Sequence, residues 1–563
     1  MAVCRVSWTG RELIGDEGRT DWFRTSQFGL PASRAARIRP DARHRPRVER
    51  HLSVANADGA TIQSRALALP APPAPGRGIK GEPYPRTTRV RLMLTTIRSF
   101  SLQTISLSTR TITTMAAPSP NPVPSFWLSD EHPLKNFQST PDLPRDADVA
   151  IIGSGITGAS ALYHLTTMAP HLRVVLLDAR DVCEGATGRN AGIAAPAGAE
   201  DFTDRVAKFG LDSALETVRF ERATVKAMLQ LVDEMGLRAH IQVRRGGVIS
   251  LAENEQEFQA LQRDLGLYLQ QASHLESDEE VRVVRPPQLQ QEFKCSDKFV
   301  GGVFTSVGYT MWPFRLVVAL VQHCLATNLN TNLQSRTLVH QVQRRSDLRY
   351  DVRTDRGTLT AQYVIHATNA YVSHLVPSLA RHVTPVRGQM VAGKLRGASQ
   401  GVTWPMAAIF NAGLEYMQQR DDGTVLLGGG REFATDVPKM EVGQPDDATM
   451  NPKVTAGLQH IFRTRFENGD KFETELVYGG IMAFTATGSP IVGRLHKAGP
   501  NAPVSNQFVA VGYTGHGMPR GFLCAKNVVL ALLGREEEMD AAVKTAYKVP
   551  SDAVEPVVGA SKL

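Results

Sequence analysis

The feature that most constrains the fold is a strand, a glycine-rich turn and a helix in direct succession. Val149–Ile152 is a short apolar run of the kind found in buried parallel strands. It leads into the turn Gly153-Ser-Gly155-Ile-Thr-Gly158, a helical segment over residues 159–167 and a second apolar run over residues 173–177. This order predicts a βαβ unit that binds a dinucleotide.

Each residue type in this unit has a physical role. Gly153 permits the tight turn out of the strand, Gly155 lets the backbone approach a pyrophosphate, and Gly158 lets the helix pack on the strands. The free amides and partial positive charge of the helix N-terminus favour phosphates. Asp178 follows the second strand and can accept hydrogen bonds from ribose hydroxyls. The unit alone does not distinguish FAD from NAD.

Other segments have a clear secondary-structure pattern. Tyr350–Arg353 and Thr358–His366 are predicted as two strands joined by a turn at Arg356-Gly357. Glu415–Arg420 is predicted as a strand before another turn, and Phe522–Leu533 as an amphipathic helix.

The charge of the chain is unevenly distributed. The net charge is +8 and the isoelectric point is about 9.2, but residues 1–114 hold 19 basic and 8 acidic residues. The remaining residues hold 44 basic and 47 acidic, a net charge of −3. The main body therefore lacks the basic character of a nucleic-acid-binding protein, and we expect no nucleic-acid partner. No apolar run is long enough to span a bilayer, so we expect no membrane span.

Residues 1–114 are rich in Arg, Pro, Ser and Ala and show no sustained apolar periodicity. We expect a disordered extension. The Arg-rich run Arg34–Arg50 lacks the interleaved aromatics that favour nucleic acid. Met93–Thr114 is basic and free of acids, as in a mitochondrial presequence, provided that translation begins at Met93. Translation from Met115, with the preceding residues a gene-model artefact, is a third possibility.

Two sequence features indicate the cellular compartment in which the protein is expected. The five cysteines form no CxxC pair, so unpaired thiols in a reducing compartment are expected: Cys4, Cys183, Cys295, Cys324 and Cys524. The chain ends in Ser561-Lys562-Leu563, a peroxisomal import address. We expect a peroxisomal protein that binds the import receptor; a mitochondrial or cytoplasmic location is the alternative.

Five motifs occur in order along the chain: Gly185-Ala-Thr-Gly-Arg-Asn-Ala-Gly192, Val364-Ile-His-Ala-Thr-Asn-Ala-Tyr371, Pro385-Val-Arg-Gly-Gln389, Thr485-Ala-Thr-Gly-Ser-Pro-Ile-Val-Gly493 and Gly512-Tyr-Thr-Gly-His-Gly517. Together with the βαβ unit they resemble the motifs of D-amino-acid-oxidase-like FAD oxidoreductases. That family includes glycine and sarcosine oxidases, D-amino-acid dehydrogenases and γ-glutamylputrescine oxidases. The resemblance covers roughly residues 125–548.

The resemblance implies an α/β fold with two domains. A doubly wound, Rossmann-like FAD-binding domain is built from discontinuous segments, and a mixed, mostly antiparallel substrate domain is inserted between them. The expected divisions are 1–114, an extension; 115–147, a lead-in segment; 148–205, 301–385 and 476–548, the FAD-binding parts; 206–300, a substrate or helical region; 386–475, the substrate-domain sheet; and 549–563, a flexible tail.

FAD is the implied cofactor. Some sarcosine-oxidase relatives attach the flavin through a cysteine, but Gly479, Gly480 and Ile481 stand at those positions, so we expect non-covalent binding. Thr487 replaces the Asp of the family's "TPDG" motif, so no role is carried over for that carboxylate. The residues expected at the cofactor are Gly153, Gly155, Ile156, Thr157, Gly158, Asp178, Ala179, Arg180, Gly185, Ala186, Thr187, Arg189, Asn190, Ala367, Thr368, Asn369, Gly512, Thr514, Gly515, His516 and Gly517.

The chemistry implied by the resemblance is oxidation of a CH–NH bond in a small amine or amino acid by hydride transfer to the flavin. The acceptor is O₂, giving H₂O₂, or, in a dehydrogenase of the same fold, a quinone or carrier; a non-catalytic dinucleotide-binding module is a further alternative. A substrate carboxylate would favour an arginine. No metal-ligand spacing is evident. The expected catalytic residues are His516, Tyr416, Arg431 and Arg387, with Arg245, Arg420 and Arg520 as further candidates.

Overall fold

The computed structural model describes residues 117–272, 279–397, 403–436 and 439–556. Residues 1–114 and Ser561–Leu563 lie outside the described residues, so the disordered extension, the presequence and the peroxisomal address stay predictions. Within the described ranges, no helix is both long enough and apolar enough to cross a bilayer. The four described cysteines are buried and free.

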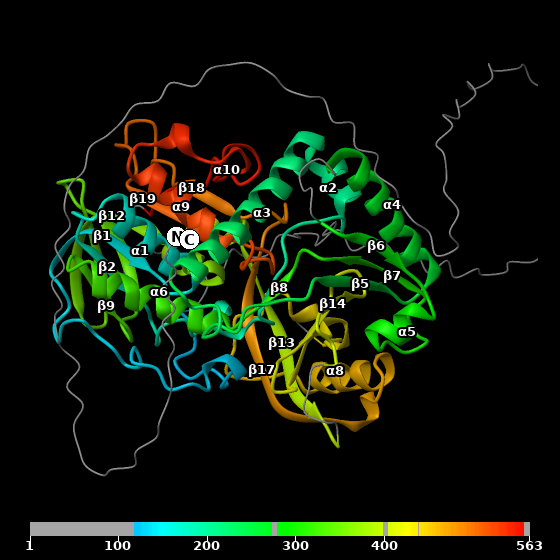
Figure 1. Ribbon diagram of the computed structural model, residues 1–563. Coiled ribbons are helices and arrows are strands. Elements are labelled where there is room, and N and C mark those ends of the chain that lie inside the picture. The colour runs from blue at the N-terminus through cyan, green and yellow to red at the C-terminus, as the bar shows by residue number, and fades with distance from the viewer. Residues whose placement is uncertain (1–116, 273–278, 398–402, 437–438, 557–563) are drawn as a thin grey trace, which may run out of the picture. The chain divides into compact units, whose positions relative to one another are not determined.

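The first sheet contains eight strands and a parallel centre (Figure 1). Its spatial order is β10 (Val339–Arg344), β11 (Tyr350–Thr354), β12 (Gly357–His366), β1 (Asp146–Ile152), β2 (Val174–Leu177) and β9 (Thr331–Gln334). β19 (Gln507–Val511) pairs parallel with the end of β12, and β18 (Ile491–Arg494) pairs antiparallel with β19. β1 and β2 are almost entirely buried, which explains their continuous apolar sequence.

Helices α1 (Ile156–Met168), α6 (Pro313–Thr327) and α9 (Gly521–Leu532) pack together against the first sheet. α6 begins with a proline at its first position, where the missing N–H costs no hydrogen bond. The predicted helices at 159–167 and 522–533 are therefore confirmed, with small shifts of their ends.

The second sheet is mostly antiparallel, and its strands β13 and β17 lie between the first sheet and the rest of the second sheet in Figure 1. Its order is β17 (Phe472–Phe484), β13 (Thr384–Leu395), β16 (Val425–Gly429), β15 (Glu415–Gln419), β14 (Ala407–Phe410), β5 (Val248–Ala252), β7 (Gly301–Thr305) and β6 (Val281–Val284). The β14–β5 pair is parallel. Helix α8 (Pro452–Arg465) covers β13, β16 and β17 over an aromatic core. This arrangement confirms the predicted mixed α/β class with a second, mostly antiparallel sheet.

The remaining elements connect the two sheets or cover them. A small sheet has the order β3 (Ile193–Ala194), β8 (Tyr309–Thr310) and β4 (Arg244–Arg245). The other helices are α2 (Phe202–Phe209), α3 (Leu211–Glu234), α4 (Glu255–Ala272), α5 (Gln288–Phe293), α7 (Val372–Leu375) and α10 (Ala541–Thr545).

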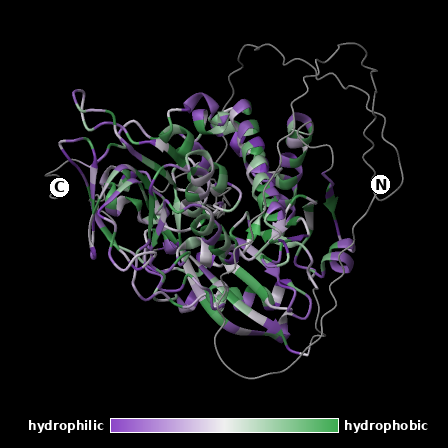
Figure 2. Ribbon diagram, turned by 60° about the vertical axis from the view of Figure 1, so that its left-hand side comes forward, coloured by the Kyte–Doolittle hydropathy of each residue, from purple (hydrophilic) through white to green (hydrophobic). Residues whose placement is uncertain are grey.

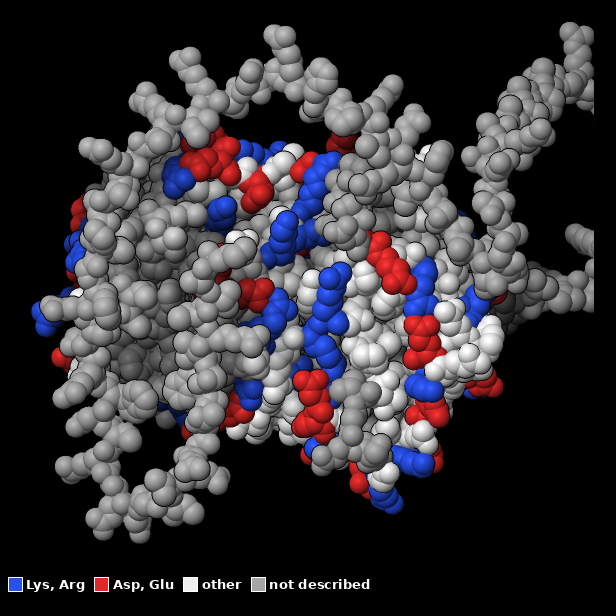
Figure 3. All heavy atoms as spheres, viewed as in Figure 1, with Lys and Arg blue, Asp and Glu red and all other residues white. Residues whose placement is uncertain are grey.

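Hydrophobic residues follow the central strands, whereas the helices carry both polar and apolar faces (Figure 2). Basic and acidic side chains are interspersed on the visible described face (Figure 3).

Two sequence-based boundaries differ from the structure. β17 runs through the division expected at residue 475. Within the flexible tail expected from residue 549, residues 549–556 are part of the folded body, because Glu555 is buried and accepts hydrogen bonds from Tyr350 Oη at 2.9 Å and Arg344 Nη1 at 2.6 Å. One buried carboxylate has no periodic signature, so the sequence does not reveal this anchor.

Candidate active site

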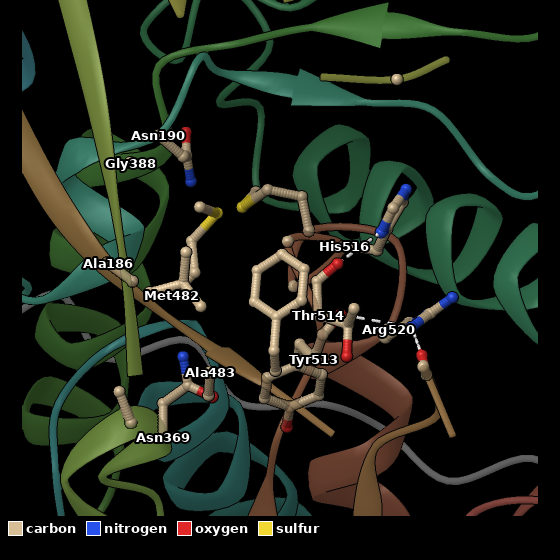
Figure 4. Close-up of a pocket in the computed structure, with 18 of the residues that line it drawn as sticks. Ala186, Asn190, Asn369, Gly388, Met482, Ala483, Tyr513, Thr514, His516 and Arg520 are labelled. Carbon is tan, nitrogen blue, oxygen red and sulfur yellow. Dashed lines mark hydrogen bonds between the residues drawn. The ribbon is translucent and has the colours of Figure 1, made fainter. Parts of the chain in front are cut away.

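A cavity of about 2220 Å³ is lined by residues from both sheets (Figure 4). Pockets for small ligands measure about 300–1,000 Å³, so this cavity has room for a dinucleotide and a second small molecule. Segments far apart in the sequence meet at it: 153–157, 178–180, 185–190, 367–369 and 514–517. Asn190, Asn369, Met482 and Thr514 surround the same space in Figure 4.

The first glycine-rich turn fits closely under the helix that follows it. Gly153 has φ +103°, and a Cβ there would lie 2.7 Å from the carbonyl oxygen of Ala367. A Cβ on Gly158 would lie 1.7 Å from the carbonyl oxygen of Gly153. The N-cap residue of α1 is Gly155, which has no side chain, so the first-turn amides other than Ile156 N remain available at the cavity wall. This turn can therefore hold an anion against the helix N-terminus.

Asp178 lies at the end of β2 and lines the cavity. Its carboxylate accepts hydrogen bonds from Ser154 N at 2.7 Å, Ser154 Oγ at 2.6 Å and Arg180 N at 2.9 Å. Burial raises its pKa. A carboxylate has about four lone-pair sites, so one further hydroxyl can be accepted.

Two cavity-lining arginines are already paired within the protein. Arg180 Nη1 lies 2.9 Å from Asp447 Oδ2, and Arg189 Nε lies 3.7 Å from the same oxygen. Arg189 Nη1 also donates to Gly479 O at 3.0 Å. The two side chains therefore join the 185–192 loop to the second sheet as part of the cavity wall.

The segment before β1 donates hydrogen bonds to the 185–192 loop. The sequence motifs did not indicate this contact. Ser125 Oγ donates to Gly188 O at 2.5 Å, and Trp127 Nε1 donates to Asn190 O at 2.5 Å. Trp127 is fully buried. Inside the loop, Thr187 Oγ1 accepts the hydrogen of Ile156 N at 3.0 Å, which ties the loop to the start of α1.

The last glycine-rich turn is connected to two other segments. Gly512 N donates to Asn369 Oδ1 at 3.1 Å, and Thr514 N donates to Ala483 O at 2.7 Å. Gly512 and Gly158 are the two expected cofactor residues that do not line the cavity. Gly512 orients the turn, and Gly158 allows the helix to approach its strand.

His516 lines the cavity as a neutral imidazole. Its Nδ1 lies 2.9 Å from Thr514 O, which places the ring proton on Nδ1 and leaves Nε2 as an acceptor. Burial lowers its pKa, and Arg520 lowers it further. Arg520 itself is held by Glu221, with Nε 2.8 Å from Glu221 Oε1.

Tyr416 and Arg431 form the wall provided by the second sheet. Both line the cavity, and the Arg431 guanidinium lies 5.3 Å from the ring centre of Phe484. Burial lowers the pKa of Arg431 and raises that of Tyr416. Among the described residues, no hydrogen bond or ion pair engages the Arg431 guanidinium. Gly388 and Met482 make the adjoining surface small and apolar.

The family model for FAD dependent oxidoreductases matches residues 148–530. The chain belongs to this family. It is an FAD-dependent oxidoreductase of the amino-acid or amine oxidase type, as the resemblance implied.

This FAD-dependent oxidoreductase is similar to two curated proteins over most of their length. It is 25% identical over 410 residues to the probable oxidoreductase OrdL of Haemophilus influenzae, covering 72% of this chain and 86% of the relative. It is 25% identical over 413 residues to the gamma-glutamylputrescine oxidoreductase of Escherichia coli, covering 70% and 85%.

Two solved structures share the fold of the oxidoreductase. Glycine oxidase from Geobacillus kaustophilus has a TM-score of 0.55 at 19% identity, covering 72% of this chain and 99% of the other. L-proline dehydrogenase from P. horikoshii has a TM-score of 0.55 at 16% identity, covering 72% and 100%. At these identities the likeness concerns the fold alone.

The cavity of the oxidoreductase suits FAD. The tight Gly153 turn and the N-terminus of α1 suit a pyrophosphate, and Asp178 has capacity for a ribose hydroxyl. Gly480 keeps the surface beside the 185–192 loop flat, because a Cβ there would lie 2.8 Å from Arg189 Cβ. The volume exceeds what a substrate alone requires.

Three of the sequence candidates do not lie at the cavity of the oxidoreductase. Arg387, which the sequence places in the catalytic set, is absent from the described cavity wall. Its Nε lies 2.6 Å from Glu441 Oε2. Arg420 is buried over the rings of Trp127 and Trp312. Arg245 is exposed.

Proposed function

We propose that this oxidoreductase oxidises the CH–NH bond of a small amino acid or carboxylate-bearing amine, with O₂ as the acceptor and H₂O₂ as the product. The observation that carries the proposal is the half-buried guanidinium of Arg431 beside Tyr416 at the cavity wall, which forms no hydrogen bond or ion pair with any described residue. A cation at a cavity wall without a protein partner favours an anionic ligand. The fold of oxidases such as glycine oxidase supports the reaction class.

FAD supplies the two-electron acceptor for the hydride that leaves the substrate carbon. We propose that the residues at 153–158 and Asp178 hold its pyrophosphate and ribose, and that the 185–190, 367–369 and 512–517 segments surround the ring. The four described cysteines are buried and none lines the cavity, which supports non-covalent binding. Acid precipitation of the holoprotein should release the flavin into the supernatant; flavin retained in the pellet would contradict this.

The protein's own groups position the substrate. Arg431 binds the carboxylate through its planar fork, with Tyr416 beside it. The apolar surface at Gly388 and Met482 favours the neutral amine, whose nitrogen lone pair promotes loss of the hydride. His516 keeps its proton on Nδ1, so Nε2 can accept a hydrogen bond. The imine product is then hydrolysed by water.

The first experiment measures peroxide release by the holoprotein with a panel of D-amino acids, N-methylated amino acids and polyamine conjugates such as γ-glutamylputrescine. The gamma-glutamylputrescine relative makes the last group a natural member of the panel. Peroxide with any of these amines supports an oxidase. Reduction of a dye without peroxide would indicate the dehydrogenase alternative, and no flavin reduction by any amine would contradict the proposal.

The second experiment tests Arg431. Arg431→Met should raise KM for the carboxylate substrate about 10- to 150-fold, the equivalent of about 1.5–3 kcal/mol for hydrogen bonds to a charged group. Flavin content should not change. Arg245→Met, which removes an exposed arginine outside the cavity wall, is the matched control. An unchanged KM in Arg431→Met would exclude this arginine as the carboxylate site.

A further inference from the structure

Two carboxyl groups lie directly behind Arg431 and Tyr416. Glu415 precedes Tyr416 in β15, and Glu432 follows Arg431 in the short 3₁₀ helix 431–433. The chain reverses at Gly429, where φ is +117° and a Cβ would lie 2.3 Å from Leu414 O. This reversal brings residues 431–432 back beside the start of β15. Neither carboxyl group lines the cavity.

The polar partners of this carboxyl pair are few. Glu415 Oε1 accepts from Gly430 N at 3.1 Å, and Glu432 Oε1 accepts from Asn411 Nδ2 at 3.4 Å. The second oxygen of each group, Oε2, is buried and receives no hydrogen bond from a protein donor. The two side chains are close enough for a carboxyl–carboxyl hydrogen bond, which requires a proton on one of them.

The charges around the pair do not neutralise it directly. Arg431 is on the same element as Glu432, and Tyr416 is on the same strand as Glu415. Arg465 of α8 also faces Glu415, but its Nη2 lies 2.6 Å from Glu253 Oε2. In the described ranges, no salt bridge reaches either member of the pair. Two like charges in one buried site cannot both be maintained without a counter-ion, so the pair favours retention of one proton.

We infer that Glu415 and Glu432 share one proton and act as positioning residues for Arg431. With one negative charge, the pair leaves the guanidinium at the cavity wall, where it binds an anionic substrate group. With two negative charges, the pair draws the guanidinium back and competes with the ligand. The inference rests on the carboxylate-binding role proposed for Arg431.

The titration of the pair gives the direction of the effect. Burial raises the pKa of Glu415, and the neighbouring Glu432 raises it further, to about 8. Below that pH Glu415 retains its proton, and above it Glu415 is ionised. Affinity for a carboxylate ligand therefore falls as the pH rises through this range, while a simple carboxylate and Arg431 itself stay ionised.

The experiment measures acetate binding to the holoprotein by the change in flavin absorbance between about pH 6.5 and 9.5. In the wild type, the Kd for acetate should rise about 10-fold from about pH 7 to 9. This rise is expected because the upper pH lies about one unit above the pKa of Glu415. In Glu432→Gln the amide donates to Glu415 and no second charge can form, so the Kd should stay constant. Glu415→Gln should behave in the same way. Glu467→Gln, at an exposed glutamate, is the control and should follow the wild type.

Infrared difference spectra add a readout that does not depend on the ligand. A protonated carboxyl band should be present in the wild type at pH 7 and absent from Glu415→Gln. Acetate binding with the same pH dependence in wild type and Glu432→Gln would overturn the shared proton but leave Arg431 as the carboxylate site. Failure of acetate to bind at any pH would overturn the carboxylate site, and the inference with it.

Discussion

Replacing Glu415 with glutamine should weaken the dependence of stability on pH. The Glu415 side chain is 1% exposed, and burial followed by Glu432 raises its pKa from 4.5 to about 8. The folded protein holds a proton that the unfolded chain releases above pH 4.5. The contribution of this proton to the free energy of unfolding is fully present below about pH 4.5 and is lost as the pH rises through about 8. At about 1.4 kcal/mol per pKa unit, the loss between pH 5 and 7 is about 2.5 kcal/mol.

Glutamine removes this titration and keeps the local hydrogen bonds. Its Oε1 can accept from Gly430 N, and its amide can donate to Glu432. The assay is thermal unfolding of the holoprotein at several pH values between about 5 and 8 for the wild type, Glu415→Gln and the exposed control Glu467→Gln. At about 2 °C per kcal/mol, the Tm of Glu415→Gln relative to the wild type should rise by about 5 °C from pH 5 to 7. A Tm difference that does not change with pH would refute the buried, protonated state of Glu415.

Three further substitutions test the architecture of the cavity. Gly158→Ala places a Cβ 1.7 Å from Gly153 O, so it should cost about 1–3 kcal/mol and lower the flavin content of the purified protein, measured by the ratio of flavin to protein absorbance. Trp127→Phe removes the hydrogen bond to Asn190 O, so flavin should dissociate faster on dilution, whereas an unchanged dissociation rate would exclude a role of the lead-in segment at the cofactor. Arg520→Met leaves the fully buried Glu221 without its counter-charge and should destabilise the protein by about 3–5 kcal/mol; Glu221→Gln in the same chain should restore part of the loss of Tm.

The local part of the fold could be predicted from the sequence because its signals are local. The apolar run at Val149–Ile152 and the glycines after it predicted β1 and the start of α1. The turn at Arg356-Gly357 likewise predicted the β11–β12 pair. The pairing of β12 with both β1 and β19 joins segments separated by more than a hundred residues. Only the resemblance to a family anticipated that convergence, because no local pattern specifies a parallel partner.

The catalytic residues were harder to predict, because a sequence motif does not show on which face of a strand each side chain lies. Val386 and Gly388 of β13 line the cavity, so the alternation of side chains places Arg387 on the opposite face, where it pairs with Glu441. The same alternation places Tyr416 at the cavity and Glu415 behind it. Register, which the sequence did not give, decides both outcomes.

Ion pairing distinguishes three arginines that build the cavity from Arg431, for which we propose a role in ligand binding. Arg180, Arg189 and Arg520 each line the cavity, and each lies within 4.0 Å of a carboxylate of Asp447 or Glu221. Removing one of them would leave a buried negative charge, so their primary effect is on folding. Arg431 differs from these three arginines, because among the described residues no carboxylate forms an ion pair with it. Its own removal should therefore break no ion pair, and loss of ligand affinity without loss of stability is the signature that separates Arg431 from the other three.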